Sequence, residues 1–170
     1  SMYNFRLGVM KALSKKGYEV IVVAPKDEFS DKIELSGFKY CNIYIDSRGK
    51  NPFYDLRTLL EIYKVLKKIK PMVVFNYTIK PCIYGSIASN LLNIKSVAVI
   101  TGLGHAFIKK SLITKVASIL YKIALKNVYG VCFLNNEDKK EFVKKGIIKN
   151  NDLGIRFRMN KFGTGFSEFF

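Results

Sequence analysis

Two short stretches combine residue types that could bind an anion, and the first of them follows residues 72–77. Thr78 and Lys80 come directly after this apolar run and offer a hydroxyl group and a cation. A helical pattern then begins at Pro81, and the first N–H groups of a helix carry positive partial charge. Together these groups suit a phosphate or pyrophosphate. The same pattern is also typical of an ordinary strand-to-helix turn with a solvated lysine.

The second stretch contains Gly102, Gly104 and His105 and follows the apolar run 96–101. Two glycines that flank one residue let the backbone turn sharply and approach a ligand closely. Successive backbone N–H groups in such a turn can bind an anion. The third glycine of a dinucleotide fingerprint is absent. His105 is the only histidine, and a single histidine more often packs or contacts substrate than acts as a base. We expect all three residues to bind substrate, and no catalytic residue is identified.

A third stretch, residues 111–126, has the pattern of a basic amphipathic helix. A step of about 100° per residue places Lys115, Lys122 and Lys126 on one stripe beside a broad apolar face. Such a helix can lie on an anionic lipid surface. A core helix whose only exposed stripe is lysine would show the same pattern. We expect these three lysines to bind the membrane and keep the core helix as the alternative.

These stretches must be positioned by an alternation of strands and helices. Continuous apolar runs, typical of a parallel sheet covered on both faces, predict strands at 20–25, 40–46, 72–77, 96–101 and 130–135. Helical patterns lie at 4–16, 27–36, 55–70, 81–92, 111–126 and 136–145. The alternation predicts an α/β fold with a three-layer, Rossmann-like, doubly wound parallel sheet. We expect residues 1–170 to form one domain.

The usual first strand of such a sheet is not visible before the helical pattern at 4–16. This strand is normally central, and a sheet without it would expose two unpaired edges. We therefore expect the first strand to be missing from this sequence.

Composition restricts the classes of partner. The chain has 29 Lys and Arg against 13 Asp and Glu, a formal net charge of +16, which favours an anionic partner unless it reflects an AT-rich genome. Three scattered cysteines without metal-binding spacing indicate buried free thiols in a reducing cytosol, and no metal site is expected. No apolar run reaches the roughly 18 residues that a spanning helix needs.

Several segments, in order along nearly the whole chain, resemble glycosyltransferase family 4, which has the GT-B architecture. The matching segments are YNFR at 3–6, GYEV at 17–20, SRGKNP at 47–52, YTIKP at 77–81, YGS at 84–86, TGLGHAF at 101–107 and KFGTGF at 161–166. The resemblance identifies the chain as the N-terminal half of such an enzyme. Two positions depart from the family pattern: His105 stands where tyrosine is common, and Thr78 where many members have histidine.

The resemblance implies a retaining transferase whose N-terminal domain binds a glycan or lipid-linked acceptor. The nucleotide sugar, usually UDP-linked, would be bound by a C-terminal domain that is absent here, and no cofactor is implied. A polyprenyl-pyrophosphate-linked acceptor would place the protein in the cytoplasm, peripherally on the inner face of the bacterial membrane. Front-face transfer assisted by the donor phosphate would need no dedicated base.

Two other functions remain open from the sequence. A nucleotide-sugar epimerase can share the same two-domain plan. A basic nucleic-acid-binding module is the other alternative, but the lysines are spread over several helices without interleaved aromatic residues on a strand face. We therefore expect no nucleic-acid partner.

Overall fold

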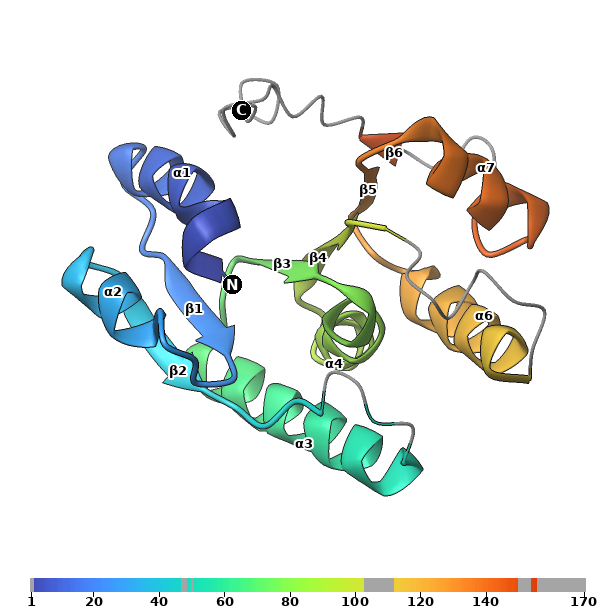
Figure 1. Cartoon of the computed structure of the whole chain (residues 1–170), viewed down its shortest axis with the longest axis horizontal. Coiled ribbons are helices and arrows are strands. Elements are labelled where there is room, and N and C mark those ends of the chain that lie inside the picture. Colours follow the sequence, from blue (N-terminus) through green and yellow to red (C-terminus); the bar gives the residue numbers. More distant parts are fainter. Residues whose placement is uncertain (1, 47–48, 50, 103–111, 150–153, 156–170) are drawn as a thin grey trace. The chain divides into compact units, whose positions relative to one another are not determined.

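The computed structural model describes residues 2–46, 49, 51–102, 112–149 and 154–155 (Figure 1). The chain divides into two compact units, one of Ser1–Ile45 with Phe157–Phe170 and the other of Asp46–Arg156. In both units helices alternate with parallel strands. The predicted α/β, Rossmann-like fold class is therefore confirmed, and the strand expected before the first helix stays a prediction.

The first unit contains a two-stranded parallel sheet. Its elements are α1 (Met2–Lys15), β1 (Ile21–Ala24), α2 (Ser30–Leu35) and β2 (Lys39–Asn42). The register of β1 and β2 runs from Ile21 opposite Lys39 to Ala24 opposite Asn42. Gly17 follows α1 with a φ of +85°, a conformation that glycine adopts without strain, and it ends the helix as the sequence predicts. The buried core residues of this unit are Met10, Val22, Ile33 and Phe38.

The second unit contains a four-stranded parallel sheet in the order β3-β4-β5-β6. Its elements are α3 (Pro52–Ile69), β3 (Val73–Tyr77), the π-helix η1 (Pro81–Gly85), α4 (Ser86–Leu91), β4 (Lys95–Ile100), α6 (Leu112–Leu125), β5 (Gly130–Phe133), α7 (Asn136–Lys144) and β6 (Gly154–Ile155). The short strand β6 was not predicted, because its two residues are too few to produce an apolar pattern.

Local capping explains where α3 begins and ends. The Asn51 side chain accepts a hydrogen bond from the Phe53 N–H at 3.0 Å, and Pro52 occupies the first helical turn. Lys70 then takes a left-handed conformation and donates its backbone N–H to the Leu66 carbonyl oxygen. The helix consequently starts at Pro52, three residues before the start that apolar periodicity predicts.

The core of the second unit lies around β4 and β5. All four residues of β5 and the last five of β4 are buried, as continuous apolar strands between two helical layers should be. The Phe142 ring of α7 packs edge-to-face against Tyr121 of α6 and Phe133 of β5, with ring centroids 5.1 and 5.2 Å away. This packing holds α6 and α7 against β5, the strand that pairs with β4.

Candidate functional site

Parallel pairing brings the ends of β3 and β4 to one edge of the sheet. The register runs from Val73 opposite Lys95 to Tyr77 opposite Val99. Thr78 and Lys80 follow β3, and Gly102 follows β4, so all three lie at the carboxyl edge where ligands bind in such sheets. Gly104 and His105, the other two predicted substrate-binding residues, lie outside the described residues.

Thr78 has a left-handed backbone conformation, with a φ of +69°. This conformation is costly for a β-branched residue and is found mostly at turns and functional sites. The Cys82 N–H donates to the Thr78 carbonyl oxygen at 2.9 Å, which ties the turn to the start of η1. The Thr78 side chain is exposed, so its hydroxyl group can reach a ligand.

Replacing Thr78 by asparagine should therefore stabilise the fold by about 1 kcal/mol, because asparagine tolerates the left-handed region better. Urea unfolding of the two proteins measures this difference. Asn93 offers the reverse control, since it is exposed with a φ of +54°, and Asn93→Thr should destabilise the chain by a similar amount. A Thr78→Asn protein no more stable than the parent would contradict the strain at this turn.

Gly102 has a φ of +146°, which L side chains rarely adopt. A Cβ atom built at this position would meet nothing within 4 Å among the described residues. The backbone conformation therefore favours glycine here, and the described residues leave the adjacent space open. This combination suits close approach of a ligand to the peptide N–H groups, and binding of substrate by Gly102 stays a prediction.

Lys80 is not an isolated cation. Its Nζ atom donates to Asp55 Oδ1 at 2.6 Å and to the Gly49 carbonyl oxygen at 2.9 Å. The side chains of Lys80 and Asp55 are 14% and 21% exposed. The Gly49 N–H in turn donates to Asp46 Oδ1 at 2.8 Å. Lys80 thus connects the turn after β3 to the first turn of α3 and to the segment that precedes it.

Tyr84 also contacts Asp55, the partner of Lys80. It lies in η1, is 8% exposed, and hydrogen-bonds through its hydroxyl group to the Asp55 carboxylate. Burial, and after it the hydrogen bond and the charge of Asp55, raise the pKa of Tyr84 above its ordinary value. The phenol therefore stays protonated at neutral pH and acts as a donor to Asp55.

A tight contact holds η1 against β3. A Cβ atom added at Gly85 would lie 2.2 Å from Asn76 Oδ1, so only glycine allows this approach. Asn76 is 5% exposed, and its Nδ2 atom donates to Ser86 Oγ at 3.3 Å. The Cys82 thiol donates to the Asn76 carbonyl oxygen at 3.1 Å. These contacts fix the helix that follows Lys80, and they explain why glycine occurs within a helical pattern.

The cysteines do not form a reactive site. Cys41, Cys82 and Cys132 are free thiols, as the sequence predicts, and the last two are buried. Burial raises the pKa of Cys132 to about 12, and it raises the pKa of Cys82 above its ordinary value as well. Both thiols therefore stay protonated near neutral pH, which makes them poor nucleophiles.

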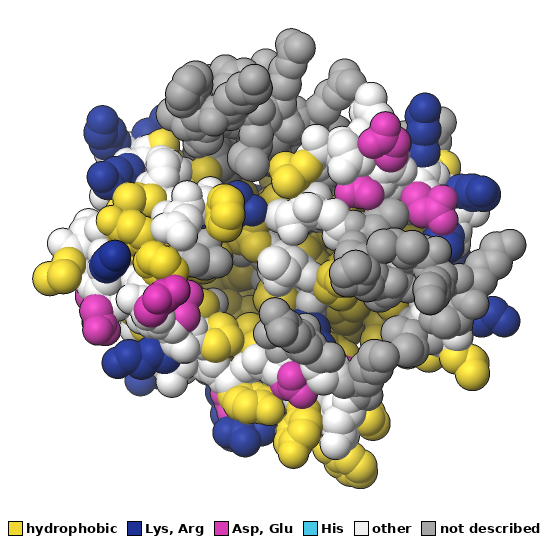
Figure 2. All heavy atoms as spheres, viewed as in Figure 1, with side chains coloured by type: hydrophobic (Ala, Val, Ile, Leu, Met, Phe, Trp, Pro, Cys, Tyr) yellow, Lys and Arg dark blue, Asp and Glu magenta, His cyan; other side chains and the backbone are white. Residues whose placement is uncertain are grey.

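The surface of α6 differs from that of a helix fully packed in a core. Leu112, Val116, Ile119 and Ile123 share one stripe and are 80%, 53%, 59% and 57% exposed. Lys115, Lys122 and Lys126 are exposed beside this stripe, and α6 contains no acidic residue. Apolar side chains also reach the surface on other elements (Figure 2), among them α3, but α3 carries Asp55 and Glu61. The exposed face of α6 is therefore both apolar and basic.

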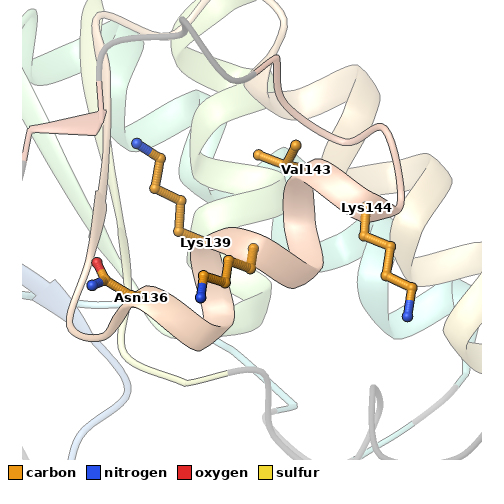
Figure 3. Close-up of a pocket in the computed structure, with 5 residues that line it drawn as sticks. Asn136, Lys139, Val143 and Lys144 are labelled. Atoms are coloured by element: carbon orange, nitrogen blue, oxygen red, sulfur yellow. The ribbon is translucent and has the colours of Figure 1, made fainter.

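A pocket of about 500 Å³ lies along α7 (Figure 3). Its lining residues are Asn136, Lys139, Lys140, Val143 and Lys144.

Across the described ranges, no three His, Cys, Asp or Glu side chains gather closely enough to hold a metal ion. Within those same ranges, no helix has the length and apolarity needed to cross a bilayer.

Asp55 was not singled out from the sequence, and Gly49 and Tyr84 appeared only within the segments 47–52 and 84–86 that resemble the family. Lys80, the partner of Asp55 and Gly49, lies 25 residues from Asp55 and 31 from Gly49, so periodicity gives no indication of these contacts. One signal was available: Asp55 is the only acidic residue in the first turn of α3. An acid is expected there from the helix dipole alone, which made it unremarkable.

Comparison with known sequences assigns the chain to an enzyme family. Residues 1–135 match the family described as glycosyl transferase 4-like. The chain is 29% identical over 175 residues to N,N'-diacetylbacillosaminyl-diphospho-undecaprenol alpha-1,3-N-acetylgalactosaminyltransferase of Campylobacter jejuni. That alignment covers 100% of this chain and 46% of the relative. The chain thus spans about half the length of the curated relative that it matches.

Solved structures with the same fold include a transferase and an epimerase. A glycosyltransferase from Rickettsia africae matches with a TM-score of 0.64 and 19% identity, over 91% of this chain and 38% of that one. The UDP-GlcNAc 2-epimerase from Methanocaldococcus jannaschii matches with a TM-score of 0.58 and 20% identity, over 86% of this chain and 40% of that one. These similarities show the fold and do not separate the two activities.

Proposed function

This chain belongs to the glycosyl transferase 4-like family, and we propose that it is the acceptor-binding half of a retaining enzyme that extends a polyprenyl-pyrophosphate-linked glycan. The nucleotide sugar would occupy a C-terminal domain rather than this half. The printed name of the Campylobacter relative describes transfer of N-acetylgalactosamine to a sugar on diphospho-undecaprenol. We propose the same class of acceptor for this chain.

The observation that carries the proposal is the carboxyl edge of β3 and β4. Thr78 supplies an exposed hydroxyl group there, Lys80 a partly buried cation, and Gly102 an open backbone. These groups can bind different parts of a phosphorylated glycan. Gly104 and His105 are also proposed to bind substrate, with His105 as a contact rather than a base. No residue of this half is proposed to act as a nucleophile or a general base.

We further propose that α6 docks this half on the inner face of the cytoplasmic membrane, where such an acceptor is embedded. The exposed apolar stripe of α6 would enter the interface, and Lys115, Lys122 and Lys126 would contact anionic headgroups. Each lysine near an anionic surface contributes about 1 kcal/mol. Peripheral docking of this kind needs no spanning helix.

A binding experiment with the chain itself tests the proposed function. Calorimetric titration with a short-chain polyprenyl-pyrophosphate saccharide should show saturable binding, whereas a UDP-N-acetylhexosamine should show none. Mixing the chain with labelled nucleotide sugar and this acceptor should give no transfer, because the donor site belongs to the other half. Saturable binding of the nucleotide sugar without binding of the acceptor would contradict the proposal and favour an epimerase.

A further inference from the structure

The group around Lys80 has little net positive charge. The ammonium of Lys80 and the carboxylate of Asp55 lie 2.6 Å apart and offset each other, and Tyr84 is a neutral donor. The Asp46 carboxylate lies on the other side of Gly49 and accepts the N–H of that residue. The Asp55 carboxylate therefore stands beside the ammonium, and an incoming pyrophosphate would meet repulsion from Asp55 as well as attraction to Lys80.

Lys80 and Asp55 retain hydrogen-bonding sites that their contacts within the described residues do not use. An ammonium has three donors, and Lys80 uses two of them, on Asp55 and on the Gly49 carbonyl oxygen. A carboxylate has about four lone-pair sites, and within the described part of the chain Asp55 accepts from Lys80 and Tyr84. One donor and about two acceptor sites thus remain. A sugar hydroxyl or amide group both donates and accepts, and it matches this remainder better than a phosphate does.

We propose that Asp55 and Lys80 form a subsite for uncharged hydroxyl or amide groups of the acceptor saccharide, and that the pyrophosphate is bound elsewhere on the carboxyl edge. This inference rests on the proposed function. One hydroxyl group donates to the Asp55 carboxylate, and a neighbouring oxygen accepts from Lys80 Nζ. Tyr84 is a positioning residue, which holds the Asp55 carboxylate through its hydroxyl group. An ion pair that is already formed and partly buried can do this without burying an unpaired charge.

Two probes separate a sugar subsite from a phosphate subsite. The first is a short-chain prenyl pyrophosphate that carries a saccharide, and the second is the same prenyl pyrophosphate without sugar. Asp55→Asn should weaken binding of the first probe about 10-fold or more, as expected for a lost hydrogen bond to a charged group. It should leave the second probe unchanged within about twofold. Tyr84→Phe should also weaken only the first probe, by a smaller factor, while keeping the ring that packs in η1.

Binding of the pyrophosphate by Lys80 would change the affinities for the two probes in a different way. If Lys80 binds the pyrophosphate, Asp55→Asn removes a competing negative charge and should tighten binding of both probes, which would overturn the inference. Equal weakening of both probes, by a chain whose urea midpoint matches the parent, would overturn it as well. If Asp55→Asn fails to fold, the affinities of Tyr84→Phe for the two probes provide the test instead. A parent chain that binds neither probe would contradict the proposed function itself rather than the assignment of the subsite.

Discussion

Replacing Val116, Ile119 and Ile123 together by serine is expected to lower the affinity of the chain for anionic vesicles about 100-fold. All three side chains are more than half exposed on α6, so the change leaves the core intact. Partial burial of each aliphatic side chain in the bilayer interface would contribute about 1 kcal/mol, and 1.4 kcal/mol corresponds to a factor of ten. Co-sedimentation with vesicles that contain an acidic phospholipid measures the change in affinity.

The lysines supply a second, salt-sensitive contribution. Lys115, Lys122 and Lys126 replaced by glutamine should also reduce binding, mostly at low salt, since screening weakens the attraction of exposed charges. The matched control replaces three exposed apolar residues on other elements, Leu35, Met72 and Leu91, by serine and should bind as the parent does. If the serine variant of α6 binds as tightly as this control, the stripe does not contact the membrane.

Gly85→Ala is expected to destabilise the chain by about 2–4 kcal/mol. The new methyl group would lie 2.2 Å from Asn76 Oδ1 and 2.8 Å from its Cγ, and Asn76 is buried. Displacing Asn76 adds the strain of overpacking, about 1–3 kcal/mol, and disturbs its hydrogen bond to Ser86. The gain of about 0.5–1 kcal/mol from replacing a helical glycine offsets only part of this. Urea unfolding measures the loss.

A double-mutant cycle identifies the cause of that loss. Asn76→Ala makes room for the methyl group, so the two substitutions together should cost less than the sum of their separate effects. Ser89→Ala is the control on the next helix, because its buried hydroxyl group has no partner among the described residues and its removal should be nearly neutral. Strict additivity of Gly85→Ala and Asn76→Ala would mean that Asn76 is not the obstacle.

Apolar patterning predicted the strands of the fold well because burial on both faces leaves a strong signature. The runs at 96–101 and 130–135 became β4 and β5, which are almost wholly buried. Helix ends were harder to place, since α3 begins at a cap that depends on the single side chain of Asn51. The lysines predicted to form a stripe on α6 are exposed. Periodicity alone could not tell which part of the broad apolar face of α6 would be buried by neighbouring elements and which part would stay exposed.

The positions of the candidate residues in the fold were predicted, but their contacts were not. Thr78, Lys80 and Gly102 were placed at one edge because parallel strands end together, and the register of β3 and β4 confirms that geometry. Lys80 was interpreted as an available cation, whereas the structure pairs it with Asp55. That pairing depends on how α3 lies against the turn after β3, which is a tertiary contact that no local pattern contains. The left-handed conformation of Thr78 was likewise invisible, because threonine is not expected there.

The most direct test of the account is an NMR titration of the isotope-labelled chain with the short-chain polyprenyl-pyrophosphate saccharide. Saturable shifts should concentrate at the amides that follow β3 and β4, including Thr78, Lys80 and Gly102. An equal concentration of UDP-N-acetylhexosamine should leave the same amides unchanged. We expect acceptor binding at this edge without donor binding. Shifts confined to the opposite edge of the sheet, or produced by the nucleotide sugar alone, would contradict it.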